Sequence, residues 1–365
     1  LDLAAADLVR SAFGHQGQKC SAASLGILVG TVATDERFLR QVVDAAASLH
    51  VGPTTDLATM FGPLVAPASG KLLDALTVLA PGEEWLLEPR CLDDEGRTWT
   101  PGIKAGVRPG SQFHRTEYFG PVLGLMATDT LEEAIAVQNA VDYGLTGGIH
   151  SLDPVEVDAW LERVEVGNAY VNRAITGAIV QRQPFGGWKR SSVGVGAKAG
   201  GPDYLLQLGT WTPTRDLSEV DPTELAIADD GWWEGRYGIP QDPAGLFCEA
   251  NVLRYLPFPD LIVRVGPGAT QAEVDRVLAA ATRCGVAPRI SRATDDDDAT
   301  FAGTLTAHRF GRIRAVGFVS ETIRRAAIAA EVELVDESVT ASGRLELRHH
   351  LREQAISRTL HRFGN

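Results

Sequence analysis

Short apolar runs that alternate with amphipathic segments are the feature that most constrains how this chain can fold. In the C-terminal third, the runs Leu261–Val265, Ile313–Gly317 and Val332–Val335 predict strands. The segments Thr270–Ala281 and Ser320–Ala329 lie between them and have the apolar spacing of helices. Strands that alternate with helices indicate a parallel sheet covered by helices. We therefore expect an α/β domain in this part of the chain.

The N-terminal part of the chain has the same mixed character. The apolar, β-branched run Leu25–Thr31 predicts a strand, and Asp35 is suited to cap a helix that extends to about Leu49. Further helices are expected over Pro67–Leu79, up to Val137 after a cap at Asp129 or Thr130, and from Asp153 to about Val164. The first part of the chain is therefore also expected to be α/β.

The boundary between the two parts is expected near residue 212. The segment Leu208–Thr214 predicts a short strand that leaves the first domain, and the polar, acidic stretch after it resembles a linker. We therefore expect a first domain over residues 1–212, a linker over 213–247 and a second domain over 248–365.

Composition excludes several classes of function. The 365 residues carry a net charge of −13, which argues against nucleic acid or an anionic membrane as partner. No apolar run approaches the roughly 18 residues that predict a membrane span. We expect no signal peptide, because the opening residues lack a basic region and a long apolar core. The four cysteines are too widely spaced for a metal or redox pair, which favours a reducing, cytoplasmic setting. The chain opens without methionine inside a helical pattern, so we expect residues before Leu1.

One of these cysteines, Cys20, lies in a glycine-bearing turn just before the first predicted strand. A thiol on such a turn can be reached by a ligand, and its thiolate is a nucleophile. Lys19 would favour that anion electrostatically, and the small residues after Cys20 leave room for a substrate. The alternative is a buried, inert cysteine, which is more common for a single cysteine considered alone.

The cysteine stretch Phe13–Ser21, with the sequence FGHQGQKCS, resembles the nucleophile segment of the aldehyde dehydrogenase superfamily. Its form is similar to the 1-pyrroline-5-carboxylate dehydrogenase branch, which includes the aldehyde dehydrogenase half of bifunctional proline-utilisation enzymes. The stretch Thr116–Leu123, TEYFGPVL, resembles the ExFGPV motif of the same family. The resemblance implies that Cys20 is the nucleophile, that Glu117 binds the nicotinamide ribose of NAD, and that Phe119 packs beside the nicotinamide. Without the motif, Glu117 would be read as a solvated charge and Phe119 as a core residue.

A third stretch, which runs from Gly167 to Ser192, closely resembles the same branch. In that branch a glycine-containing segment anchors the substrate's α-carboxylate through backbone N–H groups, which are suited to bind anions. The resemblance assigns this role to Gly177 and Ala178 and places Lys19 and Ser21 near the same end of the substrate. It also implies that Phe185 walls the aliphatic part of the aldehyde. His150, in a GLTGG segment of the family, is expected to be structural.

The resemblance also indicates what the chain lacks. In the family, a dinucleotide-binding half precedes the nucleophile, and none of it is present here. The whole protein is therefore expected to supply that half, with a proline dehydrogenase domain as a possible further part, and to form a homo-oligomer. The fold class implied is an α/β aldehyde dehydrogenase catalytic domain followed by a Rossmann-like α/β domain.

Four stretches in the C-terminal part resemble the extra C-terminal domain of long bacterial proline-utilisation enzymes: Glu249–Tyr255, Gly343–Leu347, Leu351–Ser357 and His361–Asn365. That domain does not bind nucleotide, and its implied role is to cap the catalytic module. Gly266–Gly268 is expected to be a simple turn, since it lacks the GxGxxG pattern. No metal is expected, because His349 and His350 have no third ligand nearby in sequence.

The expected function is NAD-dependent oxidation of L-glutamate-γ-semialdehyde to L-glutamate in proline catabolism. The 365 residues alone are expected to show no turnover, because most of the NAD site is missing. Two alternatives stay open: a non-catalytic assembly or binding protein, and a cysteine-dependent ester or thioester hydrolase that needs no NAD.

Overall fold

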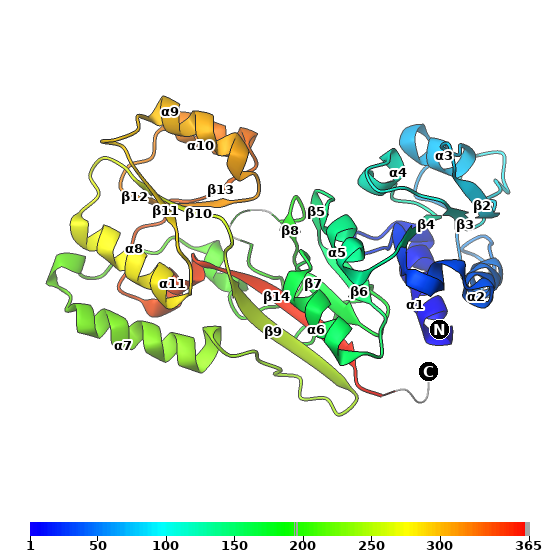
Figure 1. Ribbon diagram of the computed structural model, residues 1–365, viewed down its shortest axis with the longest axis horizontal. Coiled ribbons are helices and arrows are strands. Elements are labelled where there is room, and N and C mark those ends of the chain that lie inside the picture. The colour runs from blue at the N-terminus through cyan, green and yellow to red at the C-terminus, as the bar shows by residue number, and fades with distance from the viewer. Residues whose placement is uncertain (193, 195, 362–365) are drawn as a thin grey trace. The chain divides into compact units, whose positions relative to one another are not determined.

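The structure is a computed structural model that describes residues 1–192, 194 and 196–361 of the chain. It contains two compact units (Figure 1). Unit 1 consists of Leu1–Ala178, Phe247–Glu249 and the described residues from Ser357 onward, and unit 2 consists of Ile179–Leu246 and Ala250–Ile356. This division falls earlier in the chain than the predicted domain boundary at residue 212. Residues 362–365, the end of the stretch His361–Asn365 used for the C-terminal resemblance, lie outside the described residues.

The sheet of unit 1 has the strand order β1-β4-β3-β2. β1 (Leu25–Val29), β4 (Val122–Thr128) and β3 (Gly102–Ala105) are parallel, and β2 (Glu84–Leu87) pairs with β3 in the antiparallel direction. The strand predicted at Leu25–Thr31 is therefore confirmed, although it ends two residues earlier. β4 lies in the interior of the sheet, and six of its seven residues are buried, as expected of a strand covered on both faces.

One face of this sheet is covered by two helices that pack on each other, α1 (Asp2–Phe13) and α2 (Glu36–Ala47). They share an apolar cluster with Ile103 of β3 and Leu123 and Leu125 of β4. The predicted cap at Asp35 is confirmed, since its carboxylate accepts a hydrogen bond from Phe38 N at 2.9 Å. The remaining elements of unit 1 before residue 178 are α3 (Gly70–Thr77), α4 (Gln112–Arg115), α5 (Leu131–Asn139), β5 (Tyr143–Gly144), β6 (Thr146–Ile149), α6 (Pro154–Arg163) and β7 (Asn168–Val171).

The sheet of unit 2 has the order β11-β10-β12-β13. Its strands are β11 (Arg289–Arg292), β10 (Leu261–Val265), β12 (Arg312–Val316) and β13 (Glu333–Val335), and all adjacent pairs are parallel. The three strands predicted in this region are confirmed, as is the parallel α/β sheet. β11 was not predicted, because its sequence Arg-Ile-Ser-Arg contains a single apolar residue.

Helices cover both faces of this sheet (Figure 1). α8 (Gln271–Arg283) packs on one face, where Val263 belongs to the same cluster as Val274 and Val277. α9 (Asp298–Thr304) and α10 (Glu321–Ala329) pack on the other face, where Ile262 joins Phe301 and Ile323. Successive side chains of a strand point to opposite faces of the sheet, so Ile262 and Val263 pack in different apolar clusters.

The segment between the predicted domains differs from expectation. The strand predicted at Leu208–Thr214 is wrong: a 3₁₀ turn, Tyr204–Leu208, ends there and no strand follows. The segment predicted as a linker contains a 3₁₀ turn, Leu217–Glu219, the helix α7 (Pro222–Trp232) and a π turn, Trp233–Tyr237. Its many acidic residues suggested a solvated connection, yet Asp221 caps α7 by accepting from Thr223 N at 2.8 Å.

Two further strands of unit 2 each have one end in unit 1. β9 (Glu249–Pro257) and β14 (Leu351–Thr359) are neighbours in one sheet, and the short helix α11 (Gly343–Arg348) precedes β14. The two-residue strand β8 (Trp188–Lys189) lies earlier in unit 2. Among the described residues, no helix is long and apolar enough to cross a bilayer.

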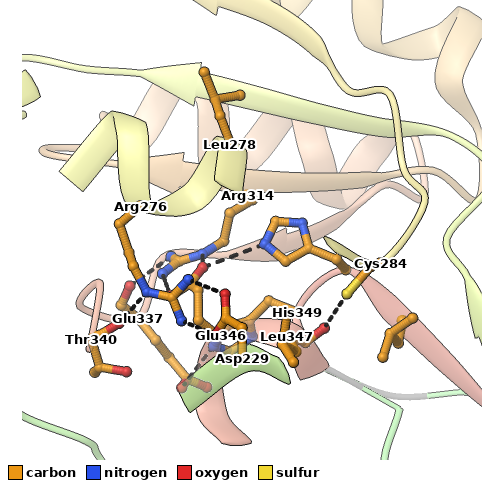
Figure 2. Close-up of polar contacts among 12 residues, drawn as sticks. Asp229, Arg276, Leu278, Cys284, Arg314, Glu337, Thr340, Glu346, Leu347 and His349 are labelled. Atoms are coloured by element: carbon orange, nitrogen blue, oxygen red, sulfur yellow. Dashed lines mark hydrogen bonds and ion pairs between the residues drawn. The ribbon is translucent and has the colours of Figure 1, made fainter. Parts of the chain in front are cut away.

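Two buried ion pairs join elements of unit 2, one between α7 and α8 and the other between α11 and the sheet (Figure 2). The Arg314 guanidinium of β12 donates to both carboxylate oxygens of Glu346 in α11, each at 2.9 Å. Arg276 of α8 donates to both oxygens of Asp229 in α7, at 2.8 and 2.7 Å. Burial acts to raise the pKa of Glu346, but Arg314 and the hydrogen bonds outweigh burial and hold that pKa well below its ordinary value.

Removal of the negative partner tests how much this network stabilises the fold. Glu346→Gln leaves Arg314 buried without a countercharge, so we expect the free energy of unfolding to fall by about 3–5 kcal/mol. Glu321→Gln is the matched control, because Glu321 forms an exposed pair with Arg325 one turn along α10, and its loss should cost less than about 0.5 kcal/mol. Urea denaturation of the 365-residue chain at neutral pH measures both. Equal, small effects would show that the buried pair contributes nothing beyond a surface pair.

Candidate active site

Two of the predicted site loops precede paired parallel strands in unit 1. Cys20 lies five residues before Leu25, the first residue of β1, and Glu117 lies five residues before Val122, the first residue of β4. Leu25 is opposite Gly124 in the parallel register, and Gly124 N donates to Ser24 O at 3.0 Å. Parallel strands begin at the same edge of a sheet, so both loops lie at that edge.

The turn before Cys20 is held in an unusual backbone conformation. His15, Gln16 and Gly17 have φ values of 54°, 59° and 67°, in the left-handed region that residues with a side chain rarely adopt. Gly17 is also packed directly against the second loop, because a Cβ built there would lie 2.2 Å from Gly120 O. Only glycine allows this approach, and it brings the Cys20 turn and the loop that carries Glu117 into backbone contact.

Cys20 is exposed, which contradicts the alternative of a buried, inert thiol. Its backbone N–H donates to no residue that the structure describes, so this group can donate to an oxygen of a ligand. Lys19 is half-buried, whereas Ser21 is buried and its carbonyl accepts from Thr146 Oγ1 at 3.3 Å. A substrate contact by Lys19 or Ser21 stays a prediction.

The second loop presents two side chains outward and one inward. Tyr118 is buried and stacks on Phe113, with ring centroids 4.8 Å apart. Glu117 is exposed, and Phe119 is 42% exposed with a φ of 58°. The alternative in which Phe119 is a core residue is therefore wrong. An exposed carboxylate and an exposed ring at the same loop fit the ribose hydroxyls and the flat face of a nicotinamide nucleoside.

Gln18 connects these loops through its side chain, a role that sequence reasoning missed. Its Nε2 donates to Phe119 O at 3.2 Å, and its Oε1 accepts from Val65 N at 2.9 Å. Gln18 lies in the cysteine stretch Phe13–Ser21, but the resemblance implied no function for its side chain. No periodicity or spacing signals such a contact, because Gln18 and Phe119 are 101 residues apart.

The third predicted loop is tied to the same region through Ser11 of α1. Ser11 Oγ accepts from Ile175 N at 3.0 Å, and Ser11 O accepts from Ala23 N at 3.0 Å. Gly177 and Ala178, just after Ile175, are exposed, and Gly177 has a φ of 86°. Their N–H groups donate to no residue within the described part of the chain, as an anion-binding loop requires.

Phe185, the remaining predicted site residue, belongs to unit 2. Its N–H and C=O pair with Ala199, and the next residue's carbonyl accepts a hydrogen bond from Lys198 Nζ. The Lys198 N–H donates in turn to Glu353 Oε2 at 3.0 Å. The predicted role of Phe185 as a wall for the substrate stays a prediction.

The carboxyl group of Glu353 is buried in a cluster of charged side chains. It hydrogen-bonds Asp203, which also accepts from Arg236 and from the Tyr255 hydroxyl, each at 2.8 Å. Burial and the neighbouring Asp203 raise the pKa of Glu353 to about 8. Burial lowers the pKa of Lys198 to about 7. Near neutral pH Glu353 is therefore protonated and donates its proton toward Asp203.

His150, His349 and His350 lie in surroundings that lower the pKa of each ring. His150 lies beside Asp7, with Nε2 to Oδ2 at 3.7 Å, and burial lowers its pKa to about 4, so the ring is neutral at neutral pH. His349 and His350 are buried after α11, and burial lowers the pKa of each. Across residues 1–192, 194 and 196–361, no three His, Cys, Asp or Glu side chains gather as a metal site.

Comparison with known proteins finds aldehyde dehydrogenases both among family models and among curated relatives. The aldehyde dehydrogenase family model matches residues 1–211. A 1-pyrroline-5-carboxylate dehydrogenase of Geobacillus sp. (strain WCH70) is 37% identical over 207 residues, which cover 56% of this chain and 39% of the relative. The relative of that name from Bacillus subtilis (strain 168) has the same identity and coverage. The chain thus spans about two fifths of the length of these curated relatives.

Solved structures extend the likeness to the second unit. Proline Utilization A (PutA) from Corynebacterium freiburgense matches with a TM-score of 0.89 and 48% identity, over 99% of this chain and 38% of that one. A 1-pyrroline-5-carboxylate dehydrogenase from Thermus with bound NAD matches with a TM-score of 0.50 and 38% identity, over 56% of this chain and 39% of that one. The expected α/β fold with an aldehyde dehydrogenase domain is thereby confirmed.

Substitution of Gly17 tests whether the two loops depend on their backbone contact. In Gly17→Ala, the new methyl group meets Gly120 O and the left-handed conformation becomes strained, so we expect a loss of about 3 kcal/mol in the free energy of unfolding. Gly14→Ala is the matched control, because no atom lies within 4 Å of its Cβ position and its φ is −53°. Urea denaturation of the 365-residue chain compares them. A Gly17→Ala chain as stable as Gly14→Ala would contradict the contact.

The protonated state of Glu353 predicts a pH dependence of stability. Because its folded pKa lies above its ordinary value, its contribution is complete below about pH 4.5 and is lost as the pH rises through about 8. The low pKa of Lys198 acts in the opposite direction above about pH 7. Glu353→Gln keeps a donor toward Asp203 without titrating. We compare the free energy of unfolding of this variant with that of the unsubstituted chain. As the pH rises from 5 to 8.5, the difference should move in favour of the variant by more than about 1 kcal/mol.

Urea denaturation over this pH range measures the difference. Glu219→Gln removes an exposed carboxyl group of the same unit and serves as the control. A stability difference between Glu353→Gln and the unsubstituted chain that does not change with pH would show that Glu353 does not hold a proton in the folded chain.

Proposed function

Because the chain belongs to the aldehyde dehydrogenase family, we propose that it supplies the nucleophile and part of the cofactor site of an enzyme that oxidises L-glutamate-γ-semialdehyde to L-glutamate with NAD⁺. The observation that carries this proposal is the backbone contact between the Cys20 turn and the loop of Glu117 and Phe119. The substrate is the open-chain form of 1-pyrroline-5-carboxylate, and the names of the curated relatives support it. Since the chain spans 39% of those relatives, the activity is proposed for the whole protein.

The first step of the proposed reaction needs only Cys20 and its own backbone. The thiolate adds to the aldehyde carbon, which forms a C–S bond and leaves negative charge on the former carbonyl oxygen. The exposed thiol and the unengaged Cys20 N–H support this step, because that N–H can donate to the oxyanion. Loss of one such donor typically costs about 3 kcal/mol of transition-state stabilisation.

The second loop is suited to hold the nicotinamide end of NAD. When bound, NAD⁺ supplies the acceptor for the hydride that leaves the carbon attached to Cys20. The Glu117 carboxylate, which accepts no hydrogen bond from any described residue, would accept from two ribose hydroxyls. The exposed ring of Phe119 would cover one face of the nicotinamide. The Cys20 thioester is then hydrolysed: water adds to its carbon, the C–S bond breaks, and the carboxylate product and the thiol are released.

The substrate's own carboxylate gives the proposed site its specificity. We assign its α-carboxylate to the N–H groups of Gly177 and Ala178, which supply hydrogen-bond donors without a charged side chain. Lys19, half-buried beside the nucleophile, adds positive charge at the same end. Phe185 is assigned to the aliphatic part of the substrate. The left-handed conformation of Gly177 supports the anion site, because it exposes successive N–H groups.

Unit 2 is proposed to have a structural role without a nucleotide. Dinucleotides bind in the crevice at the carboxyl ends of parallel strands, where the loops separate. Here the loops after β10 and β12 are bonded to each other: Phe318 N donates to Pro267 O at 2.8 Å. A Cβ on Gly266 would lie 2.1 Å from Phe318 O, so these loops leave no room for a pyrophosphate between them.

The two alternatives differ from the dehydrogenase in what they require. An ester or thioester hydrolase would use Cys20 but has no use for an exposed acid and ring at the adjoining loop. A non-catalytic protein would need neither an exposed thiol nor an unengaged N–H beside it. The dehydrogenase accounts for all of these features.

Replacement of the nucleophile tests the proposal in the complete enzyme that contains this chain. Cys20→Ala removes the sulfur, so we expect NADH formation from the aldehyde to fall at least about 10⁴-fold, close to the uncatalysed background. Cys91→Ala, which removes another exposed thiol, is the matched control and should stay active. Absorbance at 340 nm measures NADH.

Two further arms separate the alternatives. Residues 1–365 alone should form no NADH, because most of the NAD site lies in the part of the family domain not present in them. NADH formation by Cys20→Ala would reject the nucleophile. Hydrolysis of an activated ester by a complete enzyme that forms no NADH from the aldehyde would favour the hydrolase.

A further inference from the structure

The side chain of Gln18 is placed to control the loop that carries Phe119. Its Nε2 donates to Phe119 O at 3.2 Å, and its Oε1 accepts from Val65 N at 2.9 Å. Both ends of one amide are therefore used, each by the backbone of a different loop. The Gln18 backbone is also fixed, since Gln18 N donates to His15 O at 2.9 Å within the Cys20 turn.

Phe119 depends on such a contact more than an ordinary aromatic residue would. Its ring is 42% exposed, so core packing does not set its position. Its φ of 58° is unfavourable for a residue with a bulky side chain and persists only where surrounding contacts impose it. The hydrogen bond to its carbonyl fixes the peptide that follows this strained residue, and hence the direction in which the ring projects.

The same residue therefore links the nucleophile to the wall of the cofactor site. Gln18 precedes Cys20 by two residues, so its hydrogen bond to Phe119 O ties the Phe119 peptide to the Cys20 turn. Gly17 holds the adjoining backbone against Gly120, but this contact lies one residue beyond Phe119 and leaves the Phe119 carbonyl unrestrained. Gln18 supplies that restraint.

We propose that Gln18 is a positioning residue, which fixes the Phe119 peptide against the Cys20 turn and thereby sets the orientation of the nicotinamide relative to the nucleophile. This inference rests on the proposed dehydrogenase function. It gives Gln18 no contact with the reacting atoms, so its loss should impair NAD-dependent oxidation and spare the reactivity of the Cys20 thiol.

Two substitutions in the complete enzyme separate the contacts of Gln18. Gln18→Met keeps the length of the side chain and removes both hydrogen bonds. Gln18→Glu keeps an acceptor for Val65 N but loses the donor to Phe119 O. We expect both to lower kcat/KM for NAD by roughly 10- to 100-fold, because a misplaced reactant costs about this much.

Gln112→Glu is the matched control, since it introduces the same charge at an exposed side chain of α4, outside both loops. This variant should keep the kcat/KM for NAD of the unsubstituted enzyme. The second readout is the rate at which iodoacetamide alkylates Cys20, followed by mass spectrometry of the Cys20 peptide, which should change less than about twofold in all three variants.

The outcomes are distinct. A loss of kcat/KM for NAD in both Gln18 variants with unchanged alkylation supports the positioning role. A Gln18→Glu enzyme with normal kcat/KM would overturn it, because the bond to Phe119 would then be dispensable. A parallel loss of alkylation would also overturn it, since the defect would lie in the Cys20 turn as a whole. Failure of the dehydrogenase proposal itself is recognised separately, by an unsubstituted enzyme that forms no NADH.

Discussion

The close approach of Gly17 to Gly120 is the contact on which the candidate site depends. It joins two turns that are about a hundred residues apart in sequence and that each contain backbone in the left-handed region. The parallel pairing of β1 with β4 brings the turns to one edge of the sheet, and the absence of a side chain at Gly17 lets them touch. The exposed thiol, acid and ring all project from these two turns. The chemistry proposed for the chain follows from this single piece of packing.

The two units are stabilised by different kinds of interaction. Unit 1 places an apolar cluster between α1, α2 and its sheet, and its polar groups gather at the loops. Unit 2 combines apolar faces on both sides of its sheet with bidentate ion pairs at Arg314 and Arg276 that are almost fully buried (Figure 2). Buried pairs of this kind stabilise only in good geometry, and they favour one arrangement of helices over others. Such specificity is consistent with the structural role proposed for unit 2.

The sequence predicted most of the strands and helices because their signals are local. Asp35, Thr130, Asp153, Thr270 and Ser320 each cap the helix expected after them. α7 was missed because its apolar residues are clustered at 225–228 and do not follow helical spacing, and the buried partner of its Asp229, which is Arg276, is 47 residues away. β11 was missed because it contains a single apolar residue, and its strand conformation is stabilised by backbone pairing with β10.

The candidate site shows the same limit. Cys20, Glu117 and Phe119 were identified through their resemblance to family motifs, and the structure brings their turns into contact. The roles of Gly17 and Gln18 in that contact were not predicted, because each depends on a backbone group about a hundred residues away. Local propensity carries no information about such partners. Phe185 belongs to unit 2, and its substrate contact stays a prediction.

A crystal structure of the complete enzyme with bound NAD tests the central claim most directly. The claim is that the two joined turns form one catalytic site. The account predicts that the Glu117 carboxylate hydrogen-bonds the hydroxyls of the nicotinamide ribose, with the nicotinamide between Phe119 and the Cys20 thiol. NAD bound elsewhere, with Glu117 and Phe119 left in solvent, would contradict it.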